Sequence, residues 1–268
     1  MFAVDVRNVS YRYPDGTEAL RNVSLSVREN RRLAILGANG SGKTTLLMLL
    51  NGLHLAQSGS VRIFGETVTK KNLRTIRRWV GVLFDNPDNQ LFSTTVFDDV
   101  AFGPYNMGFS DADIRHRSER ALDSVGIREL AGRPPHNLSL GQKKKAAIAG
   151  LLSMDLSLFV MDEPFSGLDP NSVEEFLETL DRLHRNGCTQ IISTHDVDLA
   201  YGWADDIVIV DDGRIVVAGN PETLHDERLL NESRLRLPSL VRIFADTPYR
   251  PRTLREARDC LNSCLAQH

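Results

Sequence analysis

This 268-residue sequence contains few cysteines, only short apolar runs and little net charge. The three cysteines, Cys188, Cys260 and Cys264, form no C-x-x-C pair and match no zinc spacing. That pattern argues against a disulfide scaffold and against a structural metal site, and it suits packed thiols in a reducing compartment. A chain of this length can bury the core of one large domain or two modest ones without covalent cross-links.

No apolar run approaches the roughly 20 residues that span a bilayer. The longest runs, such as 46–50 and 207–210, contain only a handful of residues. The start of the chain, Met1 to Arg7, lacks the basic and then apolar pattern of a signal peptide. We therefore expect a cytosolic chain that does not itself cross a membrane.

The charges nearly balance, with 32 Lys and Arg against 35 Asp and Glu and a formal net charge of −3. Such a chain has no general attraction to nucleic acid or to an anionic membrane. We expect no nucleic-acid partner, and we expect local surfaces to select the partners.

Hydrophobic periodicity predicts an α/β fold. The first thirty residues alternate between apolar and polar side chains around Pro14-Asp15-Gly16, which predicts antiparallel strands joined by a turn. Short apolar runs then alternate with helix-compatible stretches, which is typical of a mainly parallel sheet covered by helices. The apolar runs are 33–36, 80–84, 158–161, 190–193 and 207–210, and the helical stretches are 111–125, 139–154 and 170–186.

Two further regions stand apart from this alternation. Residues 86–154 show helical periodicity without a convincing strand and predict an inserted helical subdomain. We predict a main domain over 1–225 and an extension over 226–268, which serves either as a dimerisation surface or as packing over the core. The extension ends in an apolar stripe at helical spacing, formed by Leu254, Ala257, Leu261, Cys264 and Leu265.

A phosphate-binding loop is predicted between the 33–36 strand and the helix that follows it. The segment satisfies G-x-x-x-x-G-K-[ST], in which backbone N–H groups surround phosphate oxygens, Lys43 reaches the β- and γ-phosphates and Thr44 ligates Mg²⁺. The alternative is a glycine-rich turn with a chance lysine. The candidate nucleotide-binding residues are Gly37, Ala38, Asn39, Gly40, Ser41, Gly42, Lys43, Thr44 and Thr45.

Two adjacent carboxylates follow the apolar run 158–161. Asp162 and Glu163 come at the carboxyl end of a predicted parallel strand, where ligands bind in open α/β sheets. We expect Asp162 to hold Mg²⁺ and Glu163 to polarise an attacking water. Taken alone, the Asp-Glu-Pro sequence would only indicate a turn.

The segment Leu138-Ser-Leu-Gly-Gln142 closely resembles the L-S-G-G-Q signature of ATP-binding cassette (ABC) ATPases. This family combines the signature with a phosphate loop in a P-loop NTPase fold. The resemblance implies that two chains bind two ATP molecules head to tail, each signature covering the nucleotide of the other chain. The signature residues in this sequence are Ser139, Leu140, Gly141 and Gln142, with Leu140 in place of the first glycine.

Other positions match the family in order. The resemblance implies that Tyr13 stacks on adenine, that Asp169 lies in a loop crossing to the partner subunit, and that His195 contacts the γ-phosphate and orders the water. By pattern alone, Tyr13 could be an exposed strand residue and His195 a polar cap. Asp85 stands where the family usually has glutamine; a carboxylate can still ligate Mg²⁺, but its charge predicts weaker Mg·ATP binding or slower turnover than in an Asp85→Gln variant.

The subfamily is indicated by the segment after Asp85. This segment, with 95–104, resembles the ATPases of energy-coupling-factor importers, in which it grips helices of a transmembrane scaffold. The signature helix 141–150 and residues 194–199 look most similar to cobalt and nickel importer subunits, and we expect the lysine run 143–145 to be a solvated helix face. The coupling residues would be Asp85, Asn86, Pro87, Asp88, Asn89 and Gln90.

The resemblance implies an ATPase that converts ATP and water to ADP and phosphate with Mg²⁺. Its partners would be a second ATPase subunit, identical or different, and transmembrane scaffold and substrate-binding subunits, at the cytoplasmic face of the membrane. A vitamin importer (biotin, riboflavin or another) and a soluble non-transport ABC ATPase are the alternatives. A chromosome-maintenance type would insert a long coiled coil, and a translation-factor type would carry two cassettes.

Overall fold

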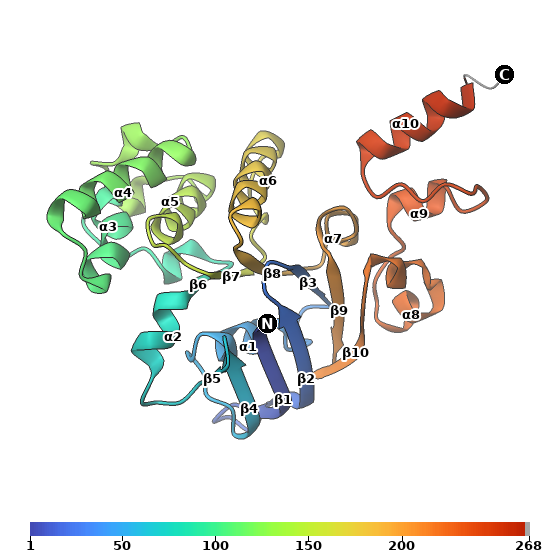
Figure 1. The fold of residues 1–268 in the computed structure, drawn as a ribbon, viewed down its shortest axis with the longest axis horizontal. Coiled ribbons are helices and arrows are strands. Elements are labelled where there is room, and N and C mark those ends of the chain that lie inside the picture. The colour runs from blue at the N-terminus through green and yellow to red at the C-terminus, as the bar shows by residue number, and fades with distance from the viewer. Residues whose placement is uncertain (266–268) are drawn as a thin grey trace.

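The computed structural model describes residues 1–265 and contains two sheets (Figure 1). In the larger sheet five neighbouring strands are parallel, and only the edge strand β10 runs antiparallel to its neighbour. The predicted α/β fold with a mainly parallel sheet is therefore confirmed. The strand order is β10 (Arg214–Gly219), β9 (Asp206–Asp211), β3 (Arg32–Leu36), β8 (Thr189–Thr194), β7 (Leu158–Asp162) and β6 (Val80–Leu83).

The smaller sheet is antiparallel where β1 pairs with β2, as the alternation of the first thirty residues predicts. A third strand, β4, pairs with the other edge of β1, so residues before and after the phosphate loop share one sheet. The strand order is β2 (Glu18–Arg28), β1 (Phe2–Arg12), β4 (Ser58–Ile63) and β5 (Glu66–Thr67).

Side chains of β3 alternate between two hydrophobic cores. Leu33 and Ile35 pack with α1 (Lys43–Leu50) and with the smaller sheet. Ala34 and Leu36 pack on the opposite face. That face is covered by α5 (Leu140–Leu152), α6 (Pro170–Arg185) and α7 (Val197–Trp203), which explains why the strand is apolar from Leu33 to Leu36.

Every element that the structure describes between β6 and β7 is helical, in agreement with the periodicity of 86–154. The helices start at polar caps: the Thr95 side chain accepts from the Asp98 amide, and the Ser110 side chain accepts from the Asp113 amide. The elements are η1 (Pro87–Asn89), α3 (Val96–Met107), α4 (Asp111–Ser124), η2 (Arg128–Leu130), η3 (Pro135–Asn137) and α5, and α2 (Leu73–Trp79) precedes β6.

The C-terminal extension both packs on the core and projects from it. Leu230 and Leu235 are buried in the core, and the Arg252 guanidinium donates to the Tyr201 carbonyl at 2.8 Å. The last helix stands away from the body in Figure 1 and leaves Leu254 and Leu261 exposed. After η4 (Pro221–His225) at the end of the main domain, the extension contains α8 (Glu227–Glu232), α9 (Ser239–Ile243) and α10 (Leu254–Leu265). The side chains of Cys264 and Leu265 and residues 266–268 lie outside the described part.

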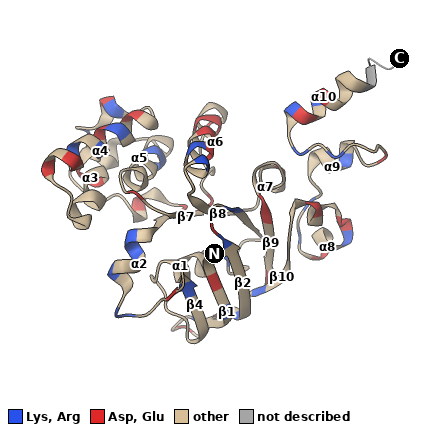
Figure 2. Ribbon diagram, in the orientation of Figure 1, with Lys and Arg blue, Asp and Glu red and all other residues tan. Residues whose placement is uncertain are grey.

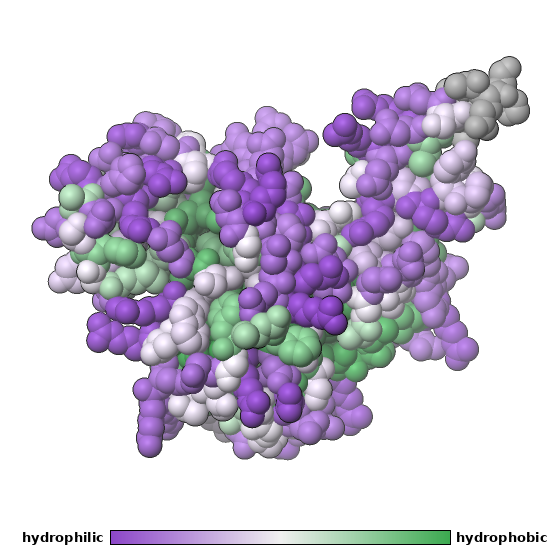
Figure 3. All heavy atoms as spheres, viewed as in Figure 1, coloured by the Kyte–Doolittle hydropathy of each residue, from purple (hydrophilic) through white to green (hydrophobic). Residues whose placement is uncertain are grey.

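Charges of both signs are spread over the helices, and arginines gather on α2 (Figure 2). In the space-filling view hydrophobic side chains reach the mainly hydrophilic surface in patches, including one over the lobe formed by α3, α4 and α5 (Figure 3). Within residues 1–265, no helix has both the length and the apolar character needed to cross a membrane.

Candidate nucleotide-binding site

The loop between β3 and α1 contains two glycines, Gly37 and Gly42, at which a Cβ would collide with backbone atoms. A Cβ on Gly37 would lie 2.2 Å from the Val210 carbonyl oxygen. Gly42 caps α1 in the left-handed region at φ 110°, where a Cβ would lie 2.6 Å from the Ala19 carbonyl oxygen. The loop therefore packs tightly against β9 and β2.

Lys43 is held inside this loop. Its ammonium donates to the carbonyl oxygens of Gly37 at 2.7 Å and Ala38 at 3.2 Å, and the residue is only 7% exposed. Burial lowers the pKa of the Lys43 ammonium, and the nearby carboxylates of Glu163 and Asp162 oppose that shift. The geometry places one cation against the loop that is predicted to hold phosphates.

Asp162 links three elements at the carboxyl edge of the sheet. Its Oδ2 accepts from the Thr44 hydroxyl at 2.6 Å, and its Oδ1 accepts from the Ser193 hydroxyl. The carboxylate is thereby fixed beside the first residues of α1. Thr44 and Asp162, which two distant motifs each predict as Mg²⁺ ligands, therefore lie within hydrogen-bond distance of each other.

Glu163 follows directly and has a backbone conformation that is unusual for its residue type. Its φ is +42°, in the left-handed region, and its amide donates to the Ser193 carbonyl at 3.1 Å. Its Oε2 lies 3.0 Å from Nδ1 of His195, whose side chain is two-thirds exposed. Its Oε1 is buried and, among the described residues, has no hydrogen-bond partner.

Lys43, Thr44, Asp162 and Glu163 line a cavity of about 620 Å³, a size typical of small-molecule sites. The lining does not include His195, Gly37, Ala38 or Ser41. Tyr13 lies on its wall, with its hydroxyl 3.0 Å from the Thr45 hydroxyl and its ring edge-on to Tyr11 and His54. The predicted residues that line the cavity are Tyr13, Asn39, Gly40, Gly42, Lys43, Thr44, Thr45, Asp85, Asp162 and Glu163.

The cavity also has walls that sequence reasoning missed. They come from the start of β2 and from the turn between β9 and β10, where the Gly213 amide donates to the Ser41 carbonyl at 2.9 Å. The Asp-Gly pair at this turn is a hairpin signal that could have located β10 but not its contact with the loop. The missed residues are Thr17, Glu18, Ala19, Arg21, Asp212 and Gly213.

The signature segment lies outside the lining of this cavity. Ser139 caps α5, and its side chain and that of Gln142 are each bonded to the other's backbone amide, at 3.3 and 3.0 Å. Leu140, the first residue of the helix, is half-exposed, and Gly141 follows it. Asp169 caps α6, and its hydrogen bonds to Ser172 hold its pKa below the ordinary value.

The expectation of a solvated lysine face over 143–145 is wrong. Lys144 is 1% exposed, and its ammonium donates to the carbonyl oxygens of Glu163 at 2.7 Å and Ser166 at 2.8 Å. Lys143 and Lys145 are half-buried in ion pairs with Asp88 and Glu175. The three lysines therefore connect α5 to its neighbours.

The residues present suit a magnesium nucleotide. Glu163 lines the cavity, and its Oε1 has no hydrogen-bond partner among the described residues, so this oxygen is available to a ligand. Hydroxyl and carboxylate oxygens of Thr44, Asp162 and Asp85 are the hard donors that Mg²⁺ prefers. The cavity thus offers a cation and loop amides to phosphate and oxygens to a metal ion.

Comparison with known proteins supports the same assignment. The model of the ABC transporter family matches residues 20–166, just over half of the chain, including the phosphate loop, the signature and both carboxylates. The chain belongs to the ABC transporter family. It is an ABC ATPase, and the activity predicted from its motifs is confirmed at that level.

Relatives of this ABC chain are similar over almost their whole length. The energy-coupling factor transporter ATP-binding protein EcfA of Carboxydothermus hydrogenoformans is 47% identical over 266 residues, which cover 98% of each chain. The protein of the same name from Methanosphaera stadtmanae is 47% identical over 244 residues, covering 90% of this chain and 88% of that one. The predicted resemblance to this group is confirmed.

Solved structures of ABC proteins share the fold. The cbiO1 protein of Clostridium perfringens, described as part of the ABC transporter complex cbiONQ, aligns with a TM-score of 0.75 at 37% identity and covers 91% of this chain and 99% of its own. The ATP-binding cassette MJ0796, in a dimeric post-hydrolysis state bound to ADP and Pi, aligns with a TM-score of 0.76 at 27% identity, covering 81% and 98%.

Proposed function

We propose that this chain is the ATP-hydrolysing subunit of an energy-coupling-factor importer, bound at the cytoplasmic face of the membrane to scaffold and substrate-binding subunits. The observation that carries the catalytic part is the Glu163 carboxylate, which has an unpartnered oxygen and lines the same cavity as Lys43 and Thr44. The likeness to EcfA over 98% of both chains supports the transport role.

In this mechanism the phosphate loop and Lys43 bind the β- and γ-phosphates. Thr44, Asp162 and Asp85 would hold Mg²⁺, which supplies positive charge to the phosphate oxygens. Glu163 accepts a proton from a water whose oxygen attacks the γ-phosphorus, and the bond from that phosphorus to the β-phosphate oxygen breaks to leave ADP and phosphate. His195 orients the Glu163 carboxylate and contacts the γ-phosphate.

A second chain completes the site. Ser139, Leu140, Gly141 and Gln142 begin α5 outside the cavity, so they are free to meet the nucleotide of a partner, with Asp169 beside the same interface. A helix N-terminus suits an anion because its first amides are not bonded within the helix. Two chains would then enclose two ATP molecules head to tail, and hydrolysis would separate them.

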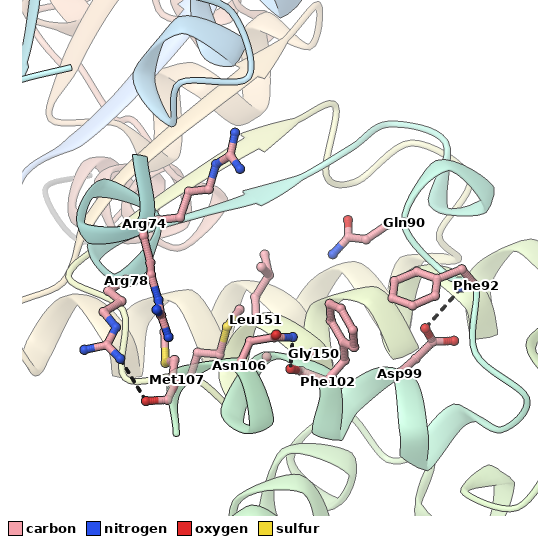
Figure 4. Close-up of a pocket in the computed structure, with 13 residues that line it drawn as sticks. Arg74, Arg78, Gln90, Phe92, Asp99, Phe102, Asn106, Met107, Gly150 and Leu151 are labelled. Carbon is pink, nitrogen blue, oxygen red and sulfur yellow. Dashed lines mark hydrogen bonds between the residues drawn. The ribbon is translucent and has the colours of Figure 1, made fainter. Parts of the chain in front are cut away.

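The membrane scaffold would bind a groove between α2, α3 and α5. The groove has a volume of about 620 Å³ and an apolar wall in which Phe92 and Phe102 meet edge to face at 4.8 Å (Figure 4). Arg74 and Arg78 of α2 lie on its other side. An amphipathic scaffold helix with acidic residues fits these walls. Of the predicted coupling segment, only Gln90 lines this groove, while Asp88 is tied to Lys143 beside it.

Cobalt or nickel is the proposed cargo, with a vitamin as the alternative. The support is the similarity of the signature helix 141–150 and of residues 194–199 to cobalt and nickel importer subunits. Uptake of radioactive cobalt, nickel or biotin by cells that express the whole importer would distinguish these cargoes.

The C-terminal extension is proposed to join two copies. Leu254 and Leu261 of α10 and Ile243 of α9 are 82%, 55% and 69% exposed, although Ala257 between them is buried. Large apolar side chains left exposed on one projecting helix are a typical dimer contact. The extension would hold the two chains together when the nucleotide-dependent interface opens.

The transport role is tested by copurification. We would express the chain with the scaffold encoded beside it and compare Phe102→Glu with Val216→Glu, a matched change of an exposed apolar residue on β10. The scaffold should copurify with the native chain and with Val216→Glu, and Phe102→Glu should lose it. Thermal unfolding checks that the Phe102→Glu variant is folded. If the folded variant recovers as much scaffold as the native chain, the groove is rejected as the docking site.

A further inference from the structure

Lys144 is a buried cation that the proposed mechanism does not use. It lies in the second turn of α5 and is 1% exposed, although a lysine side chain normally keeps its ammonium in water. Its three N–H groups face three oxygens: the carbonyls of Glu163 at 2.7 Å and Ser166 at 2.8 Å, and Oδ1 of Asp85 at 3.7 Å. Burial lowers the pKa of this ammonium, and Asp85 opposes the shift.

The first two partners belong to the segment that carries Glu163. The Glu163 backbone is in the left-handed region, which is unfavourable for a residue with a Cβ. Its amide is held by the Ser193 carbonyl of β8, and its carbonyl is held by Lys144 of α5. The peptide units on both sides of the Glu163 Cα are thus fixed by neighbouring elements. The same ammonium also donates to the carbonyl of Ser166, three residues after Glu163.

The third partner connects this anchor to the nucleotide cavity. Asp85 follows β6, lines the cavity and is 57% exposed in its side chain. Its negative charge would repel phosphate, but the Lys144 ammonium lies against it on the buried side. Two further contacts join α5 to the segment that follows Asp85. The Lys143 ammonium donates to Asp88 Oδ1 at 2.6 Å, and the Gln90 side-chain amide donates to the Ala147 carbonyl at 3.5 Å.

We infer that Lys144 is a positioning residue that fixes the backbone of Glu163 and offsets the charge of Asp85, so that α5 sets both the placement of the carboxylate and the affinity for nucleotide. The inference rests on the proposed catalytic role of Glu163. The two effects arise from different partners of one ammonium. They are therefore separable by experiment.

The experiment compares four variants: Lys144→Met, Asp85→Asn, the double variant, and Lys145→Gln as the matched control. Methionine keeps the length and apolar stem of lysine but donates no hydrogen bond. We would measure kcat and KM for Mg·ATP, and the Kd of a fluorescent ATP analogue in EDTA, which reports binding without hydrolysis or metal.

Lys144→Met should lower kcat roughly 10- to 100-fold because the carboxylate is no longer held in place. It should also raise the Kd of the analogue about fivefold, because the Asp85 charge is no longer offset. The double variant should recover the native Kd and keep the low kcat. Lys145→Gln, which loses its ion pair with Glu175 but contacts neither Glu163 nor Asp85, should match the native chain in both quantities.

A purely structural lysine gives a different pattern. Native kcat in folded Lys144→Met, or a Kd that Asp85→Asn does not restore, overturns the inference. If Lys144→Met does not fold, Lys144→Arg decides: it keeps the charge, so it should keep the Kd and lose part of kcat, and a native kcat in that variant also overturns the inference. Full hydrolysis by Glu163→Gln would instead reject the catalytic role on which the inference rests.

Discussion

The Nδ1 atom of His195 lies 3.0 Å from Oε2 of Glu163, and the second carboxylate oxygen of Glu163 has no partner among the described residues. The two residues come from different strand ends, β8 and β7, which are neighbours in the parallel sheet. The histidine therefore fixes one oxygen and leaves the other free to accept a proton. Their hydrogen bond connects two motifs 32 residues apart in sequence.

Glu163→Gln should reduce kcat for ATP hydrolysis by roughly 100- to 10,000-fold, the usual contribution of a positioned general base. The amide keeps the size of the side chain, so the Kd for ATP should change little. Steady-state release of phosphate and equilibrium binding of a fluorescent ATP analogue measure the two quantities. Hydrolysis at more than a tenth of the native rate would exclude Glu163 as the base.

His195→Ala should lower kcat while the Glu163 side chain remains able to react. The carboxylate loses its orienting partner at 3.0 Å, and we expect a fall of roughly 10- to 100-fold. His195→Gln, which can still donate one hydrogen bond, should lose less. If alanine and glutamine variants have the same kcat as the native chain, the orienting role is wrong.

Cys188 should resist alkylation in the folded protein. Burial raises the pKa of the Cys188 thiol to about 12, so almost no thiolate is present at pH 8. Cys260 is half-exposed and serves as the internal comparison. Iodoacetamide at pH 8 followed by peptide mass spectrometry should label Cys260 and spare Cys188 until urea is added. Equal labelling of both without denaturant would contradict the buried placement.

A Leu254→Glu/Leu261→Glu double variant should be monomeric without ATP if α10 joins two copies. Both side chains are exposed in the single chain, so charge there should not disturb folding. Light scattering measures the mass, and thermal unfolding checks the fold. Val216→Glu/Leu53→Glu, at exposed apolar sites elsewhere, is the matched control. An unchanged dimer in the α10 variant would leave packing as the role of the extension.

The sequence predicted the buried strands of the larger sheet and the alternating pair of β1 and β2, but it missed β4 and β10. β3 and β7 to β9 read as continuous apolar runs because helices or sheet cover both sides. In β4 only Val61 and Ile63 are buried, so this strand produced no apolar run. The apolar residues 215–218 of β10 and the Asp-Gly pair before them are a signal that was not used. Pairing with β1 and with β9 gives the places of the two strands.

Site residues could be proposed from the sequence wherever a single short motif determines the local backbone structure. The phosphate loop needs only its glycines and its lysine, and Asp162 and Glu163 only a strand end. Lys144 could not be found in this way, because its burial depends on the loops after β6 and β7 meeting α5. Three consecutive lysines predict a helix face exposed to water, but tertiary contacts bury the middle one, Lys144.

The left-handed backbone at Glu163 makes this position a compromise. A glycine there would relieve about 1 kcal/mol of conformational strain and remove the group proposed to take the proton. Selection for heat resistance alone would therefore favour losing the carboxylate, and a stabilised but inactive chain is the expected product of such a screen. The strained backbone at Glu163 lowers stability locally and keeps the carboxylate that hydrolysis is proposed to need.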